Sequence, residues 1–173
     1  MKKYLSAIIS IFVLIFIDQY TKILALTHLK NQDPFVIWDG VFELCYLENR
    51  GAAFGILQNR QIFFIIMTAI VLIAIMFIYK RTPDTKKYLP LRLTIIFITA
   101  GAIGNMIDRI FRGYVVDFFY FSLIDFPIFN VADIYVTATF FLLAILLLFY
   151  YKDEELEIYS FKKKIRLEKG SRL

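Results

Sequence analysis

The sequence has one cysteine, Cys45, and one histidine, His28, among its 173 residues. A single cysteine excludes a small secreted scaffold held together by intramolecular disulfides. No second histidine and no cysteine cluster accompany His28, so no metal-ligand spacing is present, and we expect neither a metal nor another cofactor. Charged residues are also scarce, at 20% of the chain.

Apolar residues are correspondingly abundant. The chain is 60% hydrophobic and 18% aromatic, whereas a soluble domain is about 45–50% apolar. This content excludes an intrinsically disordered chain. It also exceeds what a globule of this size hides in its interior. The sequence therefore predicts an integral membrane protein that forms one compact bundle.

Four apolar segments are long enough to cross a bilayer, which takes about 20 residues of helix. We predict an all-α integral membrane fold of four transmembrane helices, at about residues 4–25, 62–79, 89–108 and 131–151. The first segment has the alternative interpretation of a cleavable signal peptide. It lacks a clear small-x-small cleavage site and runs directly into Asp18, Gln19 and Lys22, so we expect an uncleaved anchor.

The distribution of charge predicts the orientation. Most of the 20 Lys and Arg residues lie before the first span, between the second and third, and after the fourth. Since cytoplasmic segments are enriched in Lys and Arg, we place both termini in the cytoplasm and residues 26–61 and 109–130 outside. The basic residues thus mark topology, and we expect no nucleic-acid partner. Residues 1–151 form a single membrane domain in this scheme, and 152–173 a charged, solvated cytoplasmic tail that touches anionic lipid.

The external segment from Phe35 to Glu48 contains a hairpin signal. Asp39-Gly40 lies between two apolar runs, which favours a type I′ turn. The hairpin is either a small sheet packed on the bundle or a cradle for something lying at the membrane surface.

Polar side chains that are costly in a membrane gather near the outer interface in this topology. Intramembrane ionisable groups are functional candidates by default. The residues concerned are Asp18, Asn49, Asn105, Asp108, Arg109, Asp117, Asn130 and Asp133.

Some of these have structural explanations. Asp18 and Lys22 are four residues apart, so they share a helix face, and an ordinary ion pair at a helix end makes them structural support. Asn105 and Asp108 share a face that can point into the bundle, and Gly101 and Gly104 permit close helix packing. Arg109 either closes the helix by pairing with Asp108 or holds a lipid phosphate or a carbonyl group.

Asp117 and Asp133 form the strongest candidate pair. Asp117 interrupts an apolar, strand-like stretch, and Asp133 follows Asn130, a potential cap for the fourth helix. Helix-dipole complementation explains Asp133 alone, and a bound loop carboxylate explains Asp117 alone. Together, in a chain without a Ser–His pair, they favour an aspartic dyad in which two carboxyls share one proton.

Five short motifs occur along the chain in the order DQYTK, NRGAAF, GNMIDR, VVDF and FNVAD. They resemble the lipoprotein signal peptidase (signal peptidase II) family over roughly the first 150 residues. The resemblance implies a bacterial inner-membrane aspartic endopeptidase. Such an enzyme removes the signal peptide of diacylglyceryl-modified prolipoproteins, cutting before the lipidated cysteine, and it is the target of the cyclic peptide globomycin.

The resemblance also implies residue roles. The catalytic aspartates fall on Asp117 and Asp133. Supporting or substrate-binding positions fall on Asn49, Gly51, Asn105, Asp108, Arg109, Asn130, Asp18 and Lys22. An extracytoplasmic β-cradle and a mobile surface helix map to the region 35–61, where Gly51 and Gly55 would permit movement. Thr139 replaces a glycine that is common in the family, and the tail is longer than usual. We expect a monomer.

Two other classes fit intramembrane carboxylates: a small transporter or proton conduit, and a non-enzymatic assembly factor. A conduit needs polar groups through the whole bilayer depth. The second and fourth spans each contain 18 consecutive residues without a charge, Ile62–Tyr79 and Ile134–Tyr151, which argues against transport.

Overall fold

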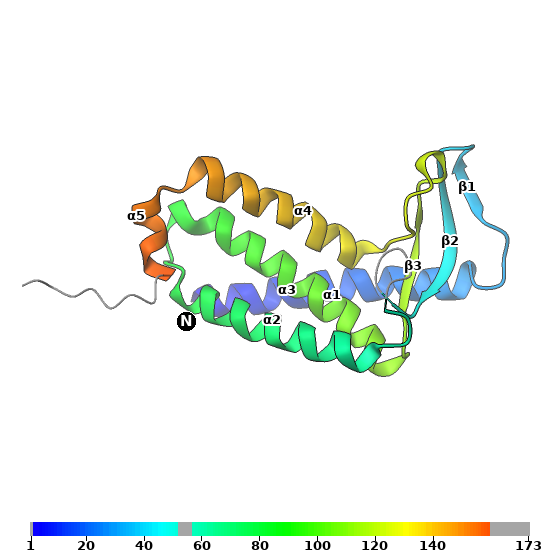
Figure 1. The fold of residues 1–173 in the computed structure, drawn as a ribbon, viewed down its shortest axis with the longest axis horizontal. Helices are drawn as coiled ribbons and strands as arrows, with labels where there is room; N and C mark the ends of the chain where they lie inside the picture. Colours follow the sequence, from blue (N-terminus) through cyan, green and yellow to red (C-terminus); the bar gives the residue numbers. More distant parts are fainter. Residues whose placement is uncertain (1, 52–56, 160–173) are drawn as a thin grey trace, which may run out of the picture.

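The computed structural model describes residues 2–51 and 57–159. Four of its helices are long and apolar enough to cross a membrane, as the sequence predicts. They are α1 (Lys2–His28), α2 (Gln61–Arg81), α3 (Leu89–Phe111, preceded by the 3-10 turn η2, Lys86–Tyr88) and α4 (Val131–Ile145, continued by the π-helical turn η4, Leu146–Tyr150). In lipid the backbone finds no other hydrogen-bond partners, so long apolar segments form helices. The four helices make an elongated bundle (Figure 1).

Local sequence explains where several helices end. The residue after α2, Thr82, is extended, as expected of a residue that precedes a proline. Pro90 lies in the first turn of α3, where its missing N–H costs nothing. Gly113 has a φ of 76° between α3 and the next strand, a conformation that glycine adopts without steric penalty.

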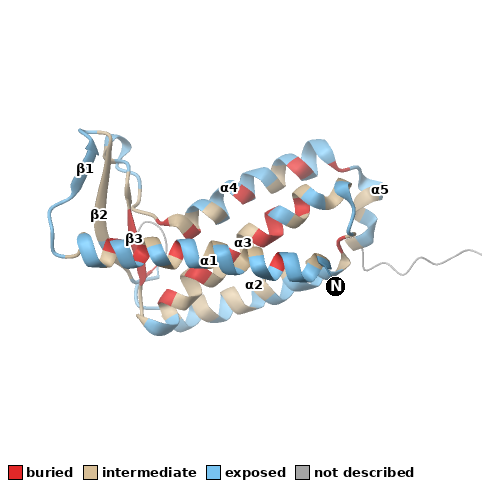
Figure 2. Ribbon diagram, turned by 180° about the vertical axis from the view of Figure 1, so that it is seen from behind, coloured by how far each residue is buried: buried red, intermediate tan, exposed pale blue. Residues whose placement is uncertain are grey.

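The central helix of the bundle is α3, which packs against α1, α2 and α4. Buried residues gather on α3 and on the strand that follows it (Figure 2). A Cβ at Gly101 would lie 2.6 Å from the carbonyl oxygen of Ala132, and a Cβ at Gly104 would lie 2.5 Å from Oδ2 of Asp18. The predicted close approach at these two glycines is therefore confirmed, and it involves α4 and α1.

A small antiparallel sheet stands at one end of the bundle (Figure 1). Its strands, in spatial order, are β1 (Phe35–Trp38), β2 (Phe42–Asn49) and β3 (Val115–Tyr120). The β1–β2 hairpin is as predicted, but its turn is not type I′. Within it only Gly40 has a positive φ, 66°, and Val41 N donates to Trp38 O at 2.9 Å. The loop spans three residues, so one left-handed residue suffices to close it.

The surface helix expected within 35–61 involves residues 52–56, which lie outside the described part of the chain. The rest of that region consists of β1, β2 and the turn residues around them.

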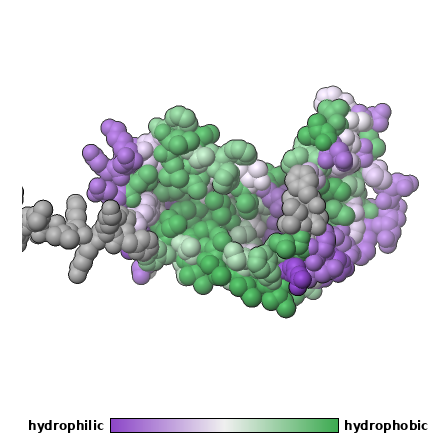
Figure 3. Space-filling model, in the orientation of Figure 1, coloured by the Kyte–Doolittle hydropathy of each residue, from purple (hydrophilic) through white to green (hydrophobic). Residues whose placement is uncertain are grey.

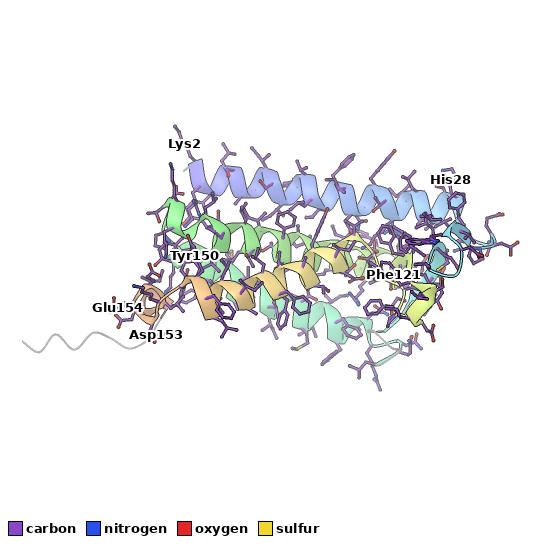
Figure 4. All side chains as sticks on the ribbon, turned by 90° about the horizontal axis from the view of Figure 1, so that it is seen from above. Lys2, His28, Phe121, Tyr150, Asp153 and Glu154 are labelled. Carbon is purple, nitrogen blue, oxygen red and sulfur yellow. The ribbon has the colours of Figure 1, made fainter. Side chains whose placement is uncertain are left out.

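The opposite end of the bundle carries the N-terminal residues and a short helix, α5 (Asp153–Leu156), followed by the turn η5 (Glu157–Tyr159). Figure 4 places Lys2, Asp153 and Glu154 at this end, and His28 and Phe121 at the sheet end. Tyr88 Oη donates to the carbonyl oxygen of Glu155 at 2.8 Å, so this part of the tail folds back onto the loop before α3. Hydrophobic residues cover the helices between the two more polar ends (Figure 3), as a protein embedded in lipid requires.

Candidate active site

Strand register places Asp117 beside Asn49. Asp117 pairs with Leu47 and Val115 pairs with Asn49, which makes Asn49 and Asp117 diagonal neighbours on one face of the sheet. Nδ2 of Asn49 donates to Oδ2 of Asp117 at 2.8 Å. Oδ1 of Asn49 accepts from the backbone N–H of Gly51 at 3.0 Å, so the amide is held from both sides.

Helix capping places Asp133. Asn130 is the N-cap of α4, as predicted, and forms a capping box with Asp133. The backbone N–H of Asp133 donates to Oδ1 of Asn130 at 3.0 Å, and the backbone N–H of Asn130 donates to Oδ2 of Asp133 at 3.1 Å. An antiparallel bridge between Phe119 and Phe129 ties this cap to β3, so that the strand and the helix start lie side by side.

Two amides bridge the carboxylates. Nδ2 of Asn130 donates to Oδ1 of Asp117 at 2.5 Å and to Oδ1 of Asn105 at 3.3 Å. Nδ2 of Asn105 donates to Oδ1 of Asp133 at 2.8 Å. The two aspartates predicted as a pair are thus joined through Asn130 and Asn105, which come from different helices.

Burial and mutual repulsion set the protonation of the pair. Asp117 is 1% exposed. Burial, and next the charge of Asp133, raise the pKa of Asp117 to about 7, although hydrogen bonds from Asn49 and Asn130 oppose the rise. Two carboxyls so coupled titrate as one unit. The pair therefore keeps a shared proton up to about neutral pH, which a general acid–base dyad requires.

Both aspartates line one pocket of about 720 Å³ at the sheet end of the bundle. Its other lining residues are Asn49, Asn105, Arg109, Val115, Phe121, Ile124, Phe126, Pro127, Ile128, Phe129, Ile134, Thr137 and Ala138. The walls are mostly apolar and aromatic, with few polar groups beside the carboxylates, as is usual for a binding site for a largely apolar ligand.

Of the alternatives for Arg109, the structure has the contact with a carbonyl group and, in the described residues, no ion pair with Asp108. Asp108 instead pairs with Lys22 at 3.1 Å and with Arg112. Arg109 donates to the carbonyl oxygen of Gly51 at 3.3 Å, and its guanidinium lies 4.8 Å from the ring centre of Phe64. Its Nε is buried and has no hydrogen-bond partner among the described residues. Arg109 also lines the pocket that holds the two aspartates.

Asp18 and Lys22 form the predicted ion pair, at 2.9 Å, but not at a helix end. The helix α1 continues to His28, and both side chains are fully buried. Oδ1 of Asp18 accepts from the backbone N–H of Ala132 at 2.9 Å, at the start of α4. The pair is thus part of a buried network that reaches the helix of Asp133.

Sequence reasoning missed Gln19 and Arg112 in this network. Nε2 of Gln19 donates to Asp18 at 3.1 Å and to Asp108 at 3.3 Å, and Arg112 contacts Asp108 and Gln19. A signal was present, because Arg112 follows Asp108 by four residues.

Thr139, the departure from the family pattern, is buried and donates to carbonyl oxygens of its own helix. In residues 2–51 and 57–159, no three His, Cys, Asp or Glu side chains gather where they could hold a metal ion.

Four membrane-length helices and a pocket with two coupled carboxyls define a multi-pass membrane hydrolase of the aspartic type. Comparison with known proteins makes the identification specific. The family model described as Signal peptidase (SPase) II matches residues 10–149. The chain belongs to this family.

Individual relatives and solved structures agree. The chain is 44% identical to the lipoprotein signal peptidase of Streptococcus thermophilus (strain CNRZ 1066), over 80% of this chain and 90% of the relative. It is 41% identical to that of Caldanaerobacter subterraneus subsp. tengcongensis, over 83% and 96%. A bacterial membrane enzyme solved by the in meso method at 2.3 Å has 34% identity and a TM-score of 0.75, with 91% of this chain and 93% of that one covered.

Proposed function

We propose that Asp117 and Asp133 are the catalytic dyad with which this enzyme removes signal peptides from prolipoproteins. The substrate class follows from the signal peptidase II family and from the lipoprotein signal peptidases that the chain resembles. The observation that carries the dyad is its geometry: two carboxyls, bridged by Asn130 and Asn105, line one apolar pocket. The scissile bond precedes a cysteine that carries a diacylglyceryl group.

The reaction follows from one proton shared by two carboxyls. The ionised carboxylate takes a proton from water as the water oxygen attacks the scissile carbonyl carbon. The protonated carboxyl donates its proton to the carbonyl oxygen, which gives a neutral tetrahedral diol. When the C–N bond breaks, the carboxyl that took the proton from water gives it to the leaving nitrogen, which becomes the free amine of the lipidated cysteine, and a hydroxyl of the diol returns its proton to the other carboxylate as the new carboxylic acid forms. The dyad then again holds one proton.

The other candidate residues have distinct roles in this proposal. Asn49, Asn105 and Asn130 orient the two carboxyls. Arg109 and Gly51 bind the substrate backbone or a lipid oxygen at the pocket wall, since Arg109 already binds the carbonyl oxygen of Gly51. Asp18 and Asp108 brace the helices behind the dyad through their ion pairs with Lys22.

The setting of the enzyme is part of the proposal. The protein is a multi-pass protein of the bacterial inner membrane. We place both termini in the cytoplasm and the active site near the outer face, because the basic residues concentrate at the end opposite the sheet. Residues 1–151 are the peptidase domain and 152–173 a cytoplasmic tail. The enzyme acts as a monomer, contacts membrane lipid, and binds cyclic peptides of the globomycin type in the dyad pocket.

The test is removal of either carboxyl without change of shape. Asp117→Asn and Asp133→Asn should each abolish cleavage of a purified diacylglyceryl prolipoprotein, because an amide cannot accept the proton from water or hold the shared one. Asp125→Asn is the matched control. Asp125 is exposed, in the loop beside the pocket, with a φ of 46° that asparagine tolerates. Near-normal cleavage by a folded Asp117 or Asp133 variant would refute the dyad.

A further inference from the structure

Lys22 makes an unusual set of contacts for a buried lysine. Its ammonium lies 2.9 Å from Oδ2 of Asp18, 3.1 Å from Oδ2 of Asp108 and 2.8 Å from Oδ1 of Asn105. An ammonium has three N–H donors and no acceptor, so all three are used. Two contacts are ion pairs that neutralise the charge. The third goes to a neutral amide of the dyad network.

That third contact determines which way the Asn105 amide points. Oδ1 of Asn105 accepts from Lys22 and also from Nδ2 of Asn130 at 3.3 Å. Rotating the amide by 180° would set its NH₂ group against two donors, a lysine ammonium and another NH₂. This arrangement leaves buried donors without acceptors, and each of them then carries its desolvation penalty uncompensated. The NH₂ group of Asn105 must therefore face Asp133, to which it donates at 2.8 Å.

The orientation of Asn130 is set by its own helix cap. Its Oδ1 accepts the backbone N–H of Asp133, so its NH₂ group faces Asn105 and Asp117. Each dyad carboxyl consequently faces amide N–H groups whose direction is fixed. Two donors that cannot reverse anchor these amides: the backbone N–H of Asp133 orients Asn130, and the ammonium of Lys22 orients Asn105.

We propose that Lys22 is a positioning residue for the dyad: by donating to Asn105, it fixes the amide orientation with which Asn105 holds Asp133 in its reactive geometry and accepts from the Asn130 amide that holds Asp117. The inference rests on the proposed function of the dyad. Lys22 touches neither the substrate nor the reacting atoms in this scheme. The charged groups that interact with it are Asp18 on α1, Asp108 on α3, Asp117 on β3 and Asp133 on α4, and Arg112 on α3 shares Asp108 with it.

The competing explanation is that Lys22 only neutralises Asp18 and Asp108. Arg112 separates the two explanations, because it also pairs with Asp108 but binds the other oxygen, Oδ1, and does not contact Asn105. Arg112→Gln thus removes a cation from the same network without touching the amide chain. The substitution Lys22→Gln provides a neutral side chain that is one atom shorter and has both a donor and an acceptor.

The experiment is a double-mutant cycle on the purified full-length protein with a diacylglyceryl prolipoprotein as substrate. Its variants are Lys22→Gln, Asn105→Ala and the two combined. Lys22→Gln should lower kcat about 10- to 100-fold, with KM changed less than threefold, because a small misplacement of a catalytic group costs rate rather than binding. In the Asn105→Ala background, Lys22→Gln should change kcat less than threefold, since a residue that acts through Asn105 has nothing left to orient.

The split between kcat and KM gives a readout that a bracing role would not move, because loss of a brace lowers the folded fraction rather than kcat alone. Arg112→Gln should lower the melting temperature but keep kcat within about threefold of the wild-type value. Additive losses in the cycle, or a kcat for Arg112→Gln reduced as much as that for Lys22→Gln, would overturn the positioning role.

Two further measurements separate possible failures. If Lys22→Gln does not fold, Lys22→Arg, which still only donates, replaces it and should retain more activity than Asn105→Ala; less activity in a folded Lys22→Arg protein contradicts the proposal. Failure of the dyad itself is recognised separately, because Asp117→Asn and Asp133→Asn would then remain active.

Discussion

At the scale of single residues, the shared proton of the dyad makes activity depend on pH. Burial and the charge of Asp133 raise the pKa of Asp117 to about 7. Because the raised pKa belongs to loss of the last shared proton, the protonated carboxyl is present below this pH and is lost above it. We expect kcat/KM for lipidated prolipoprotein to fall tenfold per pH unit well above about pH 7. Initial rates measured between about pH 5 and pH 9 check this.

Asp125→Asn is the control for this pH profile as well. Asp125 lies outside the pocket lining, so the variant should show the same fall in kcat/KM with rising pH as the wild-type enzyme. A kcat/KM that stays constant up to about pH 9 would contradict the shared proton.

Residue roles that depend on neighbours in the sequence could be predicted, whereas roles that depend on contacts between helices could not. The Asn130 cap and the first-turn position of Asp133 follow from adjacent residues, and the structure confirms both. The partner of Asp108 depends on how α1 packs on α3. The sequence suggested Arg109, the residue next to Asp108, whereas the structure has Lys22 and Arg112 as its partners. Helical spacing identifies residues that share a face, but not the side chain that another helix brings to that face.

At the scale of elements, the approach of α1 to α3 depends on the absence of a side chain at Gly104. A Cβ there would lie 2.5 Å from Oδ2 and 3.1 Å from Cγ of Asp18. Alanine is favoured over glycine in an isolated helix by about 1 kcal/mol. We nevertheless expect Gly104→Ala to destabilise the protein by about 1–3 kcal/mol, because overpacking dominates. Thermal unfolding in detergent measures the difference.

Ala102→Ser on the same helix is the control, because it also adds one heavy atom, at a half-buried position. It should change stability by no more than about 0.5 kcal/mol. A Gly104→Ala protein more stable than wild type would show that helix propensity outweighs the crowding.

The helices could be predicted from the sequence, but the turn type of the hairpin and the pairing of β2 with β3 could not. The four helices could be predicted from long uncharged runs, because a helix satisfies all backbone hydrogen bonds of a segment that lies in lipid. The hairpin followed from Asp39-Gly40, but its turn type depended on whether Val41 joined the loop, which composition does not determine. The pairing of β2 with β3 joins Asn49 to Val115, and such distant pairing leaves no local signal.

At the scale of the whole molecule, charge asymmetry decides the orientation in the membrane and thus where the active site lies. Lys2, α5 and the loop before α3 share one end, and the sheet and the dyad pocket share the other (Figure 4). Since basic segments resist translocation, the dyad should face outward.

Cysteine labelling tests this orientation. In a Cys45→Ser background, the substitution Asp33→Cys, at an exposed position, should react with an impermeant maleimide in intact spheroplasts. A cysteine replacing the exposed Thr85 should react only after permeabilisation. Both variants must cleave prolipoprotein, which shows that the labelled molecules are folded. The reverse labelling pattern would place the dyad on the cytoplasmic side and would overturn the orientation, whatever the chemistry of Asp117 and Asp133.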